Sequence, residues 1–309
     1  MGPCFVFPGQ GSQAVGMGRD LYDRYDEVKR LYAEASEVLG YDAAELSFNG
    51  PAEELNKTAK TQPCLLVASV AAAAALGLKG IRPSVVAGHS LGEYSALVAA
   101  GSISFRDAVK VTAIRGSIMQ EAVPEGKGLM AAILGLDRAA VDELCRAAAS
   151  GYVGVANYNC PGQIVISGEK AAVEETMNKA KEAGAKRALA LAVSVPSHCK
   201  LMTEAGKRLE EELGKIEIGD ARIAFVNNTG AQFISRADEI RKSLVLQLSE
   251  SVLWEDCIKT IAASGVSRFI EVGPGKVLAG LIKRIEPSAA ISTVENSETL
   301  ERTVAELQS

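Results

Sequence analysis

The sequence predicts a mixed α/β fold, in which a large subdomain built on a parallel sheet carries a small α+β subdomain as an insertion. The first observation is that short apolar runs repeatedly end in a glycine-containing turn before a helix-forming stretch, as in parallel α/β sheets. The second is that this rhythm changes in the middle of the chain. We therefore expect residues 1–124 and 196–309 to form the large subdomain and residues 125–195 the small one.

The composition is that of a globular protein and argues against several classes. The chain has 309 residues, of which 48% are hydrophobic and 23% charged, so it can bury a large core. Its net charge of -5 argues against non-specific nucleic-acid binding, because that needs a basic surface. The six cysteines lack the paired spacing of a zinc site, so we expect no bound metal.

The same reading predicts no membrane partner. The first residues lack a basic stretch followed by an apolar one, so we expect no signal peptide. The longest uncharged apolar run, residues 64–78, is shorter than the roughly 20 residues that cross a bilayer and suits a buried helix. The expected location is the cytoplasm.

The first strand and its loop lie at the N-terminus. The run Cys4–Phe7 predicts a buried strand, and Pro8-Gly9-Gln10-Gly11 predicts a glycine-rich loop before a helix. A phosphate-binding loop is the weaker alternative, because the glycine spacing matches neither nucleotide-binding motif. We expect instead a loop whose main chain approaches a substrate closely. Residues 63–78 then predict an alanine-rich core helix entered through a proline.

The next strand leads into a candidate nucleophile. Residues 84–87 are mostly apolar, Gly88-His89-Ser90-Leu91-Gly92 follows, and residues 93–100 favour a helix. The spacing G-x-S-x-G is that of the nucleophile elbow in hydrolase-like α/β enzymes, where a strained turn exposes the serine hydroxyl. A chance surface turn is the alternative, and the flanking strand and helix favour the elbow. The N–H of Leu91 would then be one donor to the oxyanion.

A serine nucleophile needs a base, and the chain has only two histidines. His89 is adjacent to Ser90, and neighbouring side chains on a tight turn diverge, so we expect a packing role for it. His198 is therefore the candidate base by elimination. The group that orients His198 cannot be read from the spacing.

A helix predicted over residues 104–123, with Ser104 as its N-cap, carries an arginine on its apolar face. Arg115 falls in line with Thr112 and Met119. It could extend past the edge of the core into solvent. Alternatively its planar guanidinium binds a substrate carboxylate through two parallel hydrogen bonds.

The middle of the chain predicts strands at 128–136, 163–167 and 187–195, with helices at 138–149 and 170–183. This order fits a ferredoxin-like insertion. After it, apolar runs at 221–226 and 269–272, the second followed by Gly273-Pro274-Gly275, return to the pattern of the large subdomain. The tail after Glu286 is polar, and we expect it to be peripheral.

Four ordered segments resemble the signatures of the bacterial malonyl-CoA:acyl-carrier-protein transacylases and the related acyltransferase domains of polyketide synthases. They are FVFPGQGSQ at residues 5–13, GHSLGEY at 88–94, VPSH at 195–198 and EVGPG at 271–275. The resemblance runs from the N-terminus to about residue 285. It implies that Ser90 is the nucleophile, His198 the base and Arg115 the malonate clamp.

The resemblance also implies roles for residues that spacing does not assign. Gln10 and Leu91 would donate their backbone N–H groups to the oxyanion, and the backbone carbonyl of Gln247 would orient His198. Further positions match the substrate cleft: Gln62, Met119, Asn159, Gln163, Arg187 and Ser197.

The implied reaction moves malonyl from malonyl-CoA to Ser90, and then to the phosphopantetheine thiol of acyl carrier protein, with no metal or redox cofactor. The alternatives are a polyketide-type acyltransferase with another extender unit, a serine thioesterase or hydrolase, and a non-catalytic module that binds carrier protein. Arg115 disfavours a simple esterase, and the two assigned histidines disfavour a degenerate module. The pathway, fatty acid or polyketide, stays open.

Overall fold

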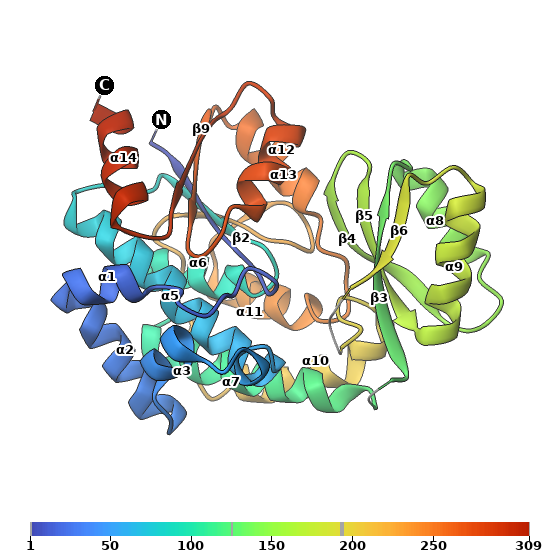
Figure 1. The fold of residues 1–309 in the computed structure, drawn as a ribbon, viewed down its shortest axis with the longest axis horizontal. Coiled ribbons are helices and arrows are strands. Elements are labelled where there is room, and N and C mark those ends of the chain that lie inside the picture. Colours follow the sequence, from blue (N-terminus) through green and yellow to red (C-terminus); the bar gives the residue numbers. More distant parts are fainter. Residues whose placement is uncertain (1, 125, 192–194, 309) are drawn as a thin grey trace.

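The computed structural model describes residues 2–124, 126–191 and 195–308, and it contains two sheets (Figure 1). The larger has the strand order β10-β9-β1-β2-β7-β8, and its pairs are parallel except for β7 with β8. Its strands are β1 Cys4–Phe7, β2 Val85–Gly88, β7 Ala224–Val226, β8 Phe233–Ile234, β9 Arg268–Val272 and β10 Ala290–Val294. The predicted mixed α/β fold, with a sheet that contains parallel strands, is confirmed.

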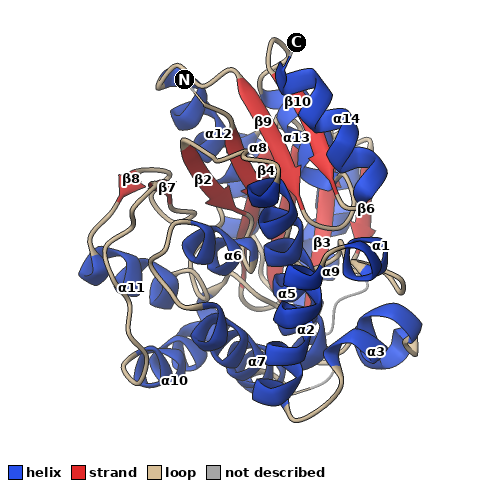
Figure 2. Cartoon of the chain, turned by 90° about the vertical axis from the view of Figure 1, so that its left-hand side faces the viewer, coloured by secondary structure: helices blue, strands red, loops and turns tan. Residues whose placement is uncertain are grey.

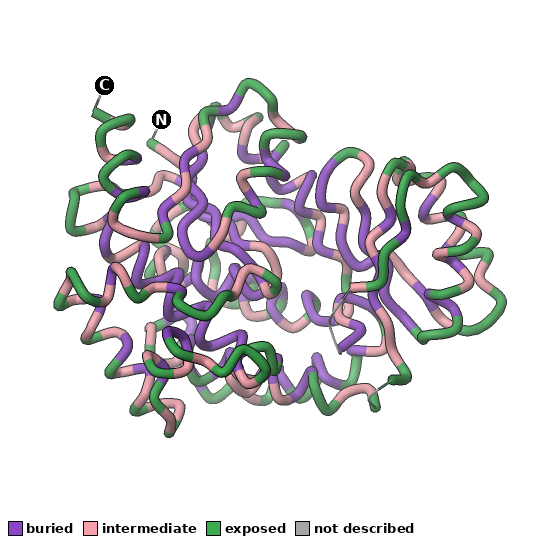
Figure 3. Tube along the Cα trace, in the orientation of Figure 1, coloured by how far each residue is buried: buried purple, intermediate pink, exposed green. Residues whose placement is uncertain are grey.

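Alternate side chains of β1 enter two separate cores. Phe5 and Phe7 pack with the helices on one face, among them α5 Thr58–Leu78, α6 Gly92–Ala99 and α7 Phe105–Ala122. Cys4 and Val6 pack on the other face, with α12 Trp254–Ala263 and α13 Val277–Ile285. Because side chains of a strand alternate, burial on both faces makes this strand apolar throughout, as predicted. Figure 3 shows the buried trace running along these central strands.

The remaining helices on this side of the molecule pack mainly against other helices, whereas the last of them packs against β10 (Figure 2). They are α1 Arg19–Arg24, α2 Asp26–Leu39, α3 Ala43–Asn49, α4 Ala52–Leu55, the short 3-10 helix Lys200–Met202, α10 Thr203–Leu213, α11 Ala237–Leu246 and α14 Ser297–Gln308.

The smaller sheet lies to one side of the large one in Figure 1, with the order β4-β5-β3-β6 and antiparallel pairs throughout. Its two helices pack on one face through Val141 and Val173. In chain order its elements are β3 Gly128–Leu134, α8 Arg138–Arg146, β4 Val153–Cys160, β5 Gln163–Glu169, α9 Lys170–Glu182 and β6 Arg187–Ala190. We keep the division at residues 125 and 195 as a proposal. The predicted strand 187–195 extends into 192–194, which lie outside the described residues.

One strand of this sheet was missed by the sequence analysis. β4 contains a glycine and two asparagines, which have low strand propensity. Its support comes from pairing with β5 and from a segment far along the chain, because Tyr158 N–H donates to the Val252 carbonyl at 3.0 Å. Long-range pairing of this kind leaves no local signal.

Helix α5 differs from the prediction at its start. It begins at Thr58 rather than at Pro63, so the proline lies inside the helix. The helix therefore has 21 residues and is long and apolar enough to cross a membrane by composition, but 78% of its most apolar window is buried inside the protein. It is the central helix of the larger core.

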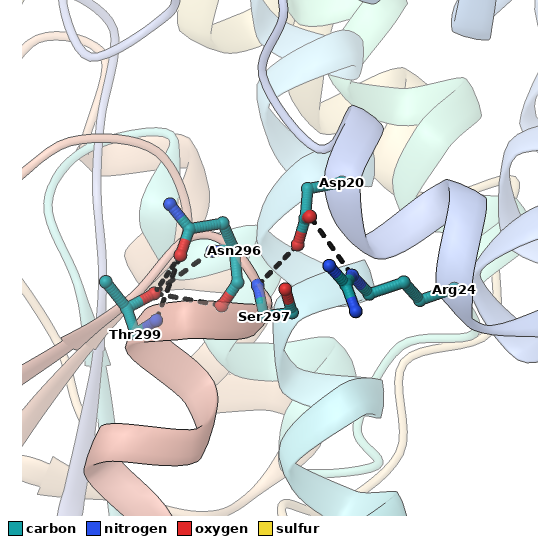
Figure 4. A network of polar contacts seen from close by, with 5 residues as sticks. All are labelled: Asp20, Arg24, Asn296, Ser297 and Thr299. Atoms are coloured by element: carbon teal, nitrogen blue, oxygen red, sulfur yellow. Dashed lines mark hydrogen bonds and ion pairs between the residues drawn. The ribbon is translucent and has the colours of Figure 1, made fainter.

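The tail is part of the fold, and the expectation that it is peripheral was wrong. β10 adds a parallel edge strand beside β9, and Val294 and Leu300 are fully buried in the larger core. Figure 4 shows how α14 is tied to α1: the Ser297 N–H donates to Asp20, which also accepts from Arg24. The charged residues of the tail are mostly exposed, among them Glu298, Glu301 and Arg302, which is why its composition misleads.

Candidate active site

The turn between β2 and α6 has the geometry of a nucleophile elbow. Ser90 has φ 51°, a left-handed conformation that is strained for a residue with a side chain. A Cβ on Gly88 would lie 1.9 Å from the carbonyl carbon of Gly92, and a Cβ on Gly92 would lie 2.1 Å from the carbonyl oxygen of Phe7. The glycine spacing thus has a steric cause, since only glycine lets the backbones approach so closely.

His198 contacts the nucleophile. Its Nε2 lies 2.8 Å from Ser90 Oγ, and its Nδ1 lies 2.7 Å from the carbonyl oxygen of Gln247. Because a carbonyl only accepts, we assign the proton to Nδ1, which leaves Nε2 free to accept the serine proton. Burial, and then the charge of Arg115, lower the pKa of His198 to about 3, so the ring is neutral near pH 7.

The other histidine lies under the elbow. His89 Nε2 is 2.9 Å from Asn159 Oδ1, and its ring meets that of Trp254 edge-on at 5.5 Å between centroids. Burial lowers its pKa as well. These contacts are those of a packed, hydrogen-bonded side chain.

Arg115 is buried, with only 1% of its surface exposed, so it does not extend into solvent. Its Nη1 donates to Gln62 Oε1 at 2.8 Å. Its Nη2 donates to Gln247 Oε1 at 3.0 Å and to Ser90 Oγ at 3.2 Å. A guanidinium is thereby fixed next to the nucleophile by two amide oxygens, in a place where a carboxylate of the acyl group could meet it.

Two residues that line the same cavity have backbone donors without a partner. Within the described residues, the N–H groups of Gln10 and Leu91 make no hydrogen bond, and both residues line the cavity that holds Ser90. The Gln10 side chain donates to Thr58 Oγ1 at 3.2 Å, which holds its loop against α5. Free donors beside a nucleophile are what an oxyanion hole requires.

The cavity lies between the two sheets. The six-stranded side contributes the nucleophile and its neighbours, and the four-stranded side contributes Met130, Asn157 and Val165. Helix α13 contributes Val277, Leu278 and Leu281, which the sequence analysis did not identify. The predicted site residues that line it are Gln10, Gln62, Ser90, Leu91, Arg115, Met119, Asn159, Gln163, Ser197 and His198.

Two predicted residues lie outside this cavity. Gln247 is fully buried behind it and touches it through His198 and Arg115. Arg187 is exposed and lines a second hollow with Lys186 and Arg284, which adjoins the first at Gln163. Arg187 therefore lies beside the cleft rather than in its wall, and its role in substrate binding stays a prediction.

The sequence analysis also missed Asn228, whose side chain is hydrogen-bonded to the backbone of the elbow. Its Oδ1 accepts from the Ser90 N–H at 2.8 Å, and its Nδ2 donates to the Gly88 carbonyl at 2.7 Å. Its position just after β7 is the available signal, since ligand-binding groups gather at the carboxyl ends of parallel strands.

Comparisons with known proteins identify the family of the chain. Residues 4–304 match the family model described as acyl transferase domain. The chain is 52% identical over 304 residues to the malonyl CoA-acyl carrier protein transacylase of Escherichia coli strain K12, covering 94% of this chain and 98% of that protein. It is 46% identical over 307 residues to the protein of the same name in Bacillus subtilis, covering 99% and 97%.

Two solved structures are similar to this chain over nearly its full length. The malonyl CoA-acyl carrier protein transacylase from Coxiella burnetii has a TM-score of 0.98 at 42% identity, with 100% of this chain and 98% of that chain covered. A malonyl-transacylase in complex with a type II PKS acyl-carrier protein has a TM-score of 0.97 at 48% identity, covering 99% and 100%. The chain belongs to the acyl transferase domain family and, within it, to the malonyl CoA-acyl carrier protein transacylases.

Proposed function

We propose that this enzyme transfers malonyl from malonyl-CoA to the phosphopantetheine thiol of an acyl carrier protein, for fatty acid biosynthesis, through an acyl-enzyme on Ser90. The observation that carries the proposal is the Arg115 guanidinium 3.2 Å from Ser90 Oγ. A buried cation beside the nucleophile has a use when the acyl group ends in a carboxylate, as malonyl does. A thioesterase or hydrolase of simple acyl groups has no use for it, which ranks that alternative lower.

The first half-reaction forms the acyl-enzyme. His198 Nε2 takes the hydroxyl proton as Ser90 Oγ attacks the thioester carbonyl. The N–H groups of Gln10 and Leu91 receive the developing oxyanion. When the carbon–sulfur bond breaks, the proton on His198 passes to the leaving CoA sulfur.

The second half-reaction reverses these roles with a new thiol. His198 takes the proton of the phosphopantetheine thiol, whose sulfur attacks the serine ester. The Ser90–acyl bond breaks, and the proton returns to Ser90 Oγ. Throughout, the Gln247 carbonyl holds Nδ1 protonated and Nε2 directed at the reacting atoms.

The acceptor could also be the carrier protein of a polyketide synthase. The observation that favours this second candidate is the 48% identity to a malonyl-transacylase solved with a type II PKS acyl-carrier protein. Both acceptors present the same thiol to the same acyl-enzyme, so the chemistry at Ser90 is shared.

Partners and location follow from charge and burial. We infer a cytoplasmic enzyme with no nucleic-acid or membrane partner, supported by the net charge of -5 and by the burial of α5. The basic hollow around Lys186, Arg187 and Arg284 is a candidate contact for an acidic carrier protein. The reaction as written requires no metal or redox cofactor.

The test is intact-mass spectrometry after mixing the protein with malonyl-CoA alone. We expect one malonyl unit on the wild-type protein and none on the Ser90→Ala variant, because the nucleophile belongs to the chain. Labelling of Ser90→Ala at the wild-type rate would refute the proposal. Addition of each purified carrier protein then shows which one accepts the group.

A further inference from the structure

Behind the nucleophile lies a buried carboxyl group that the reaction above does not use. Glu93, on α6, is fully buried only three residues after Ser90. One of its oxygens accepts from the Asn228 backbone N–H, and the other accepts from Gln247 Nε2. Through these two residues Glu93 is connected to both the elbow and Arg115.

The Gln247 amide forms the direct link between the two charges. Its Oε1 faces Arg115, since a guanidinium only donates, and the distance to Nη2 is 3.0 Å. Its Nε2 therefore faces Glu93, and it also donates to the Ser90 carbonyl at 3.0 Å. A carboxylate at Glu93 accepts only, so it favours this orientation of the amide. Arg115 and Glu93 thus polarise one amide from opposite ends.

Arg115 is the charged partner among the titratable groups that face Glu93. The others are Tyr94, from the same helix, and Cys257, from α12. Burial raises the pKa of Tyr94 to about 12 and the pKa of Cys257 well above its usual value, so both are neutral. Burial also raises the pKa of Glu93 to about 8, although the bonds from Asn228 and Gln247 and the charge of Arg115 oppose the shift.

We propose that Glu93, when ionised, is the internal counter-charge of Arg115, and that the ionised form takes up a proton when the carboxylate of the substrate binds to the guanidinium. The proposal rests on the function proposed above, in which Arg115 binds malonyl. With the substrate present, the carboxylates of malonyl and Glu93 share the buried cation Arg115. Glu93 contacts Arg115 only through Gln247, so it is the one left without a full partner. Protonation of Glu93 by solvent relieves this at the cost of one hydrogen bond from Gln247.

The direction of the pH dependence follows from the linkage of binding and protonation. Substrate binding raises the pKa of Glu93 above its free value of about 8. Proton uptake is therefore largest just above that pH, and it vanishes below about pH 7, where the free enzyme already holds the proton. Affinity for the malonyl group should fall as pH rises through this window, by up to about tenfold per pH unit. Affinity for the acetyl group should stay constant over the same pH range.

The experiment is calorimetry with two CoA analogues in which a methylene replaces the thioester sulfur, one malonyl and one acetyl, so that no acyl transfer occurs. Each is titrated into wild-type enzyme at pH 6.5 and 8.5, in pairs of buffers that differ in ionisation enthalpy. At pH 8.5 we expect uptake of roughly half a proton or more for malonyl and about none for acetyl. Equal uptake with both analogues would overturn the proposal.

Glu93→Gln should abolish the difference between the analogues. The matched control is Glu271→Gln, because Glu271 is another fully buried glutamate, bonded to the start of α13, and burial raises its pKa to about 7. That variant should keep the malonyl-specific uptake, and uptake that persists in Glu93→Gln would assign the proton elsewhere.

If Glu93→Gln does not fold, the comparison of the two analogues in the wild type still decides. Labelling of the same wild-type sample by malonyl-CoA separates the proposal on Glu93 from the proposed function. A labelled enzyme without proton uptake refutes the role of Glu93 alone, whereas an unlabelled enzyme refutes the proposed function.

Discussion

The two sides of the cavity are held in different ways. On the side of the six-stranded sheet, the reacting groups are fixed by close backbone packing and by hydrogen bonds: Ser90 lies between glycines that admit no side chain, and its N–H donates to the side-chain oxygen of Asn228. On the side of the four-stranded sheet, the cavity is lined by side chains such as Met130 and Val165, from a small apolar cluster. The reacting atoms are thus held by close backbone packing and by side-chain hydrogen bonds, whereas the apolar wall opposite them offers contact surface to the substrate.

The largest expected contrast is between the two histidines. His198→Ala should slow acylation of Ser90 by about a hundredfold to ten-thousandfold, because the general base is lost. His89→Ala removes one hydrogen bond, to Asn159, and should cost about tenfold or less. The measurement is the rate of malonyl attachment by quenched-flow mass spectrometry. A larger loss in His89→Ala would show that the assignment of the base is wrong.

The next contrast separates charge from shape at Arg115. Arg115→Ala leaves the malonyl carboxylate without a partner in a buried site, so malonyl transfer should lose about 3 kcal/mol or more. Acetyl transfer should be spared, because acetyl has no charge to pair. Lysine should restore the charge without the planar pair of donors, and therefore only part of the activity.

The measurement for Arg115 is the ratio of kcat/KM for malonyl-CoA to that for acetyl-CoA, in wild type, Arg115→Ala and Arg115→Lys. The ratio should be highest in wild type and lowest in the alanine variant. An unchanged ratio in Arg115→Ala would mean that the arginine is structural.

Several features of the site could be predicted from the sequence because they depend on residues close together in the chain. The elbow is a local motif, so its glycines, its strand and Ser90 follow from adjacent residues. Arg115 follows from the period of a single helix, with a capped start at Ser104 as predicted. His198 follows from a count of histidines together with the demand for a base.

Other features depend on contacts between distant segments and left no local pattern. Asn228 reaches Ser90 across 138 positions, and β4 draws support from Val252. The tail looked peripheral because its buried positions are sparse. Arg187 follows from the family pattern, but only the sheet order shows that it lies on an outer strand.

A smaller contrast compares two asparagines on opposite sides of the cavity. Asn228→Ala leaves the Ser90 N–H and the Gly88 carbonyl without partners, and unpaired buried groups cost about 1–3 kcal/mol each. We expect kcat/KM to fall by roughly tenfold or more. Asn157→Ala keeps its backbone bridge to Val252 and should stay within about threefold. Similar losses in kcat/KM would mean that the two sides of the cavity constrain the reacting groups equally.

The smallest expected effect concerns the basic hollow next to the cavity. Arg187 is exposed, so its charge is screened by salt and should act on the encounter with an acidic carrier protein rather than on the chemistry. Arg187→Ala should therefore lower kcat/KM for the carrier protein by a few-fold at low salt and flatten its salt dependence, while transfer to free pantetheine is unchanged.

Arg30→Ala is the matched control, because Arg30 is an exposed arginine on α2, a helix far from the four-stranded sheet in Figure 1. Steady-state transfer to both acceptors, measured from low to high salt in the three proteins, makes the comparison. Equal salt dependence for carrier protein and pantetheine would show that the basic hollow does not attract the carrier protein. Equal effects of Arg187→Ala and Arg30→Ala would show that only the net charge of the enzyme matters.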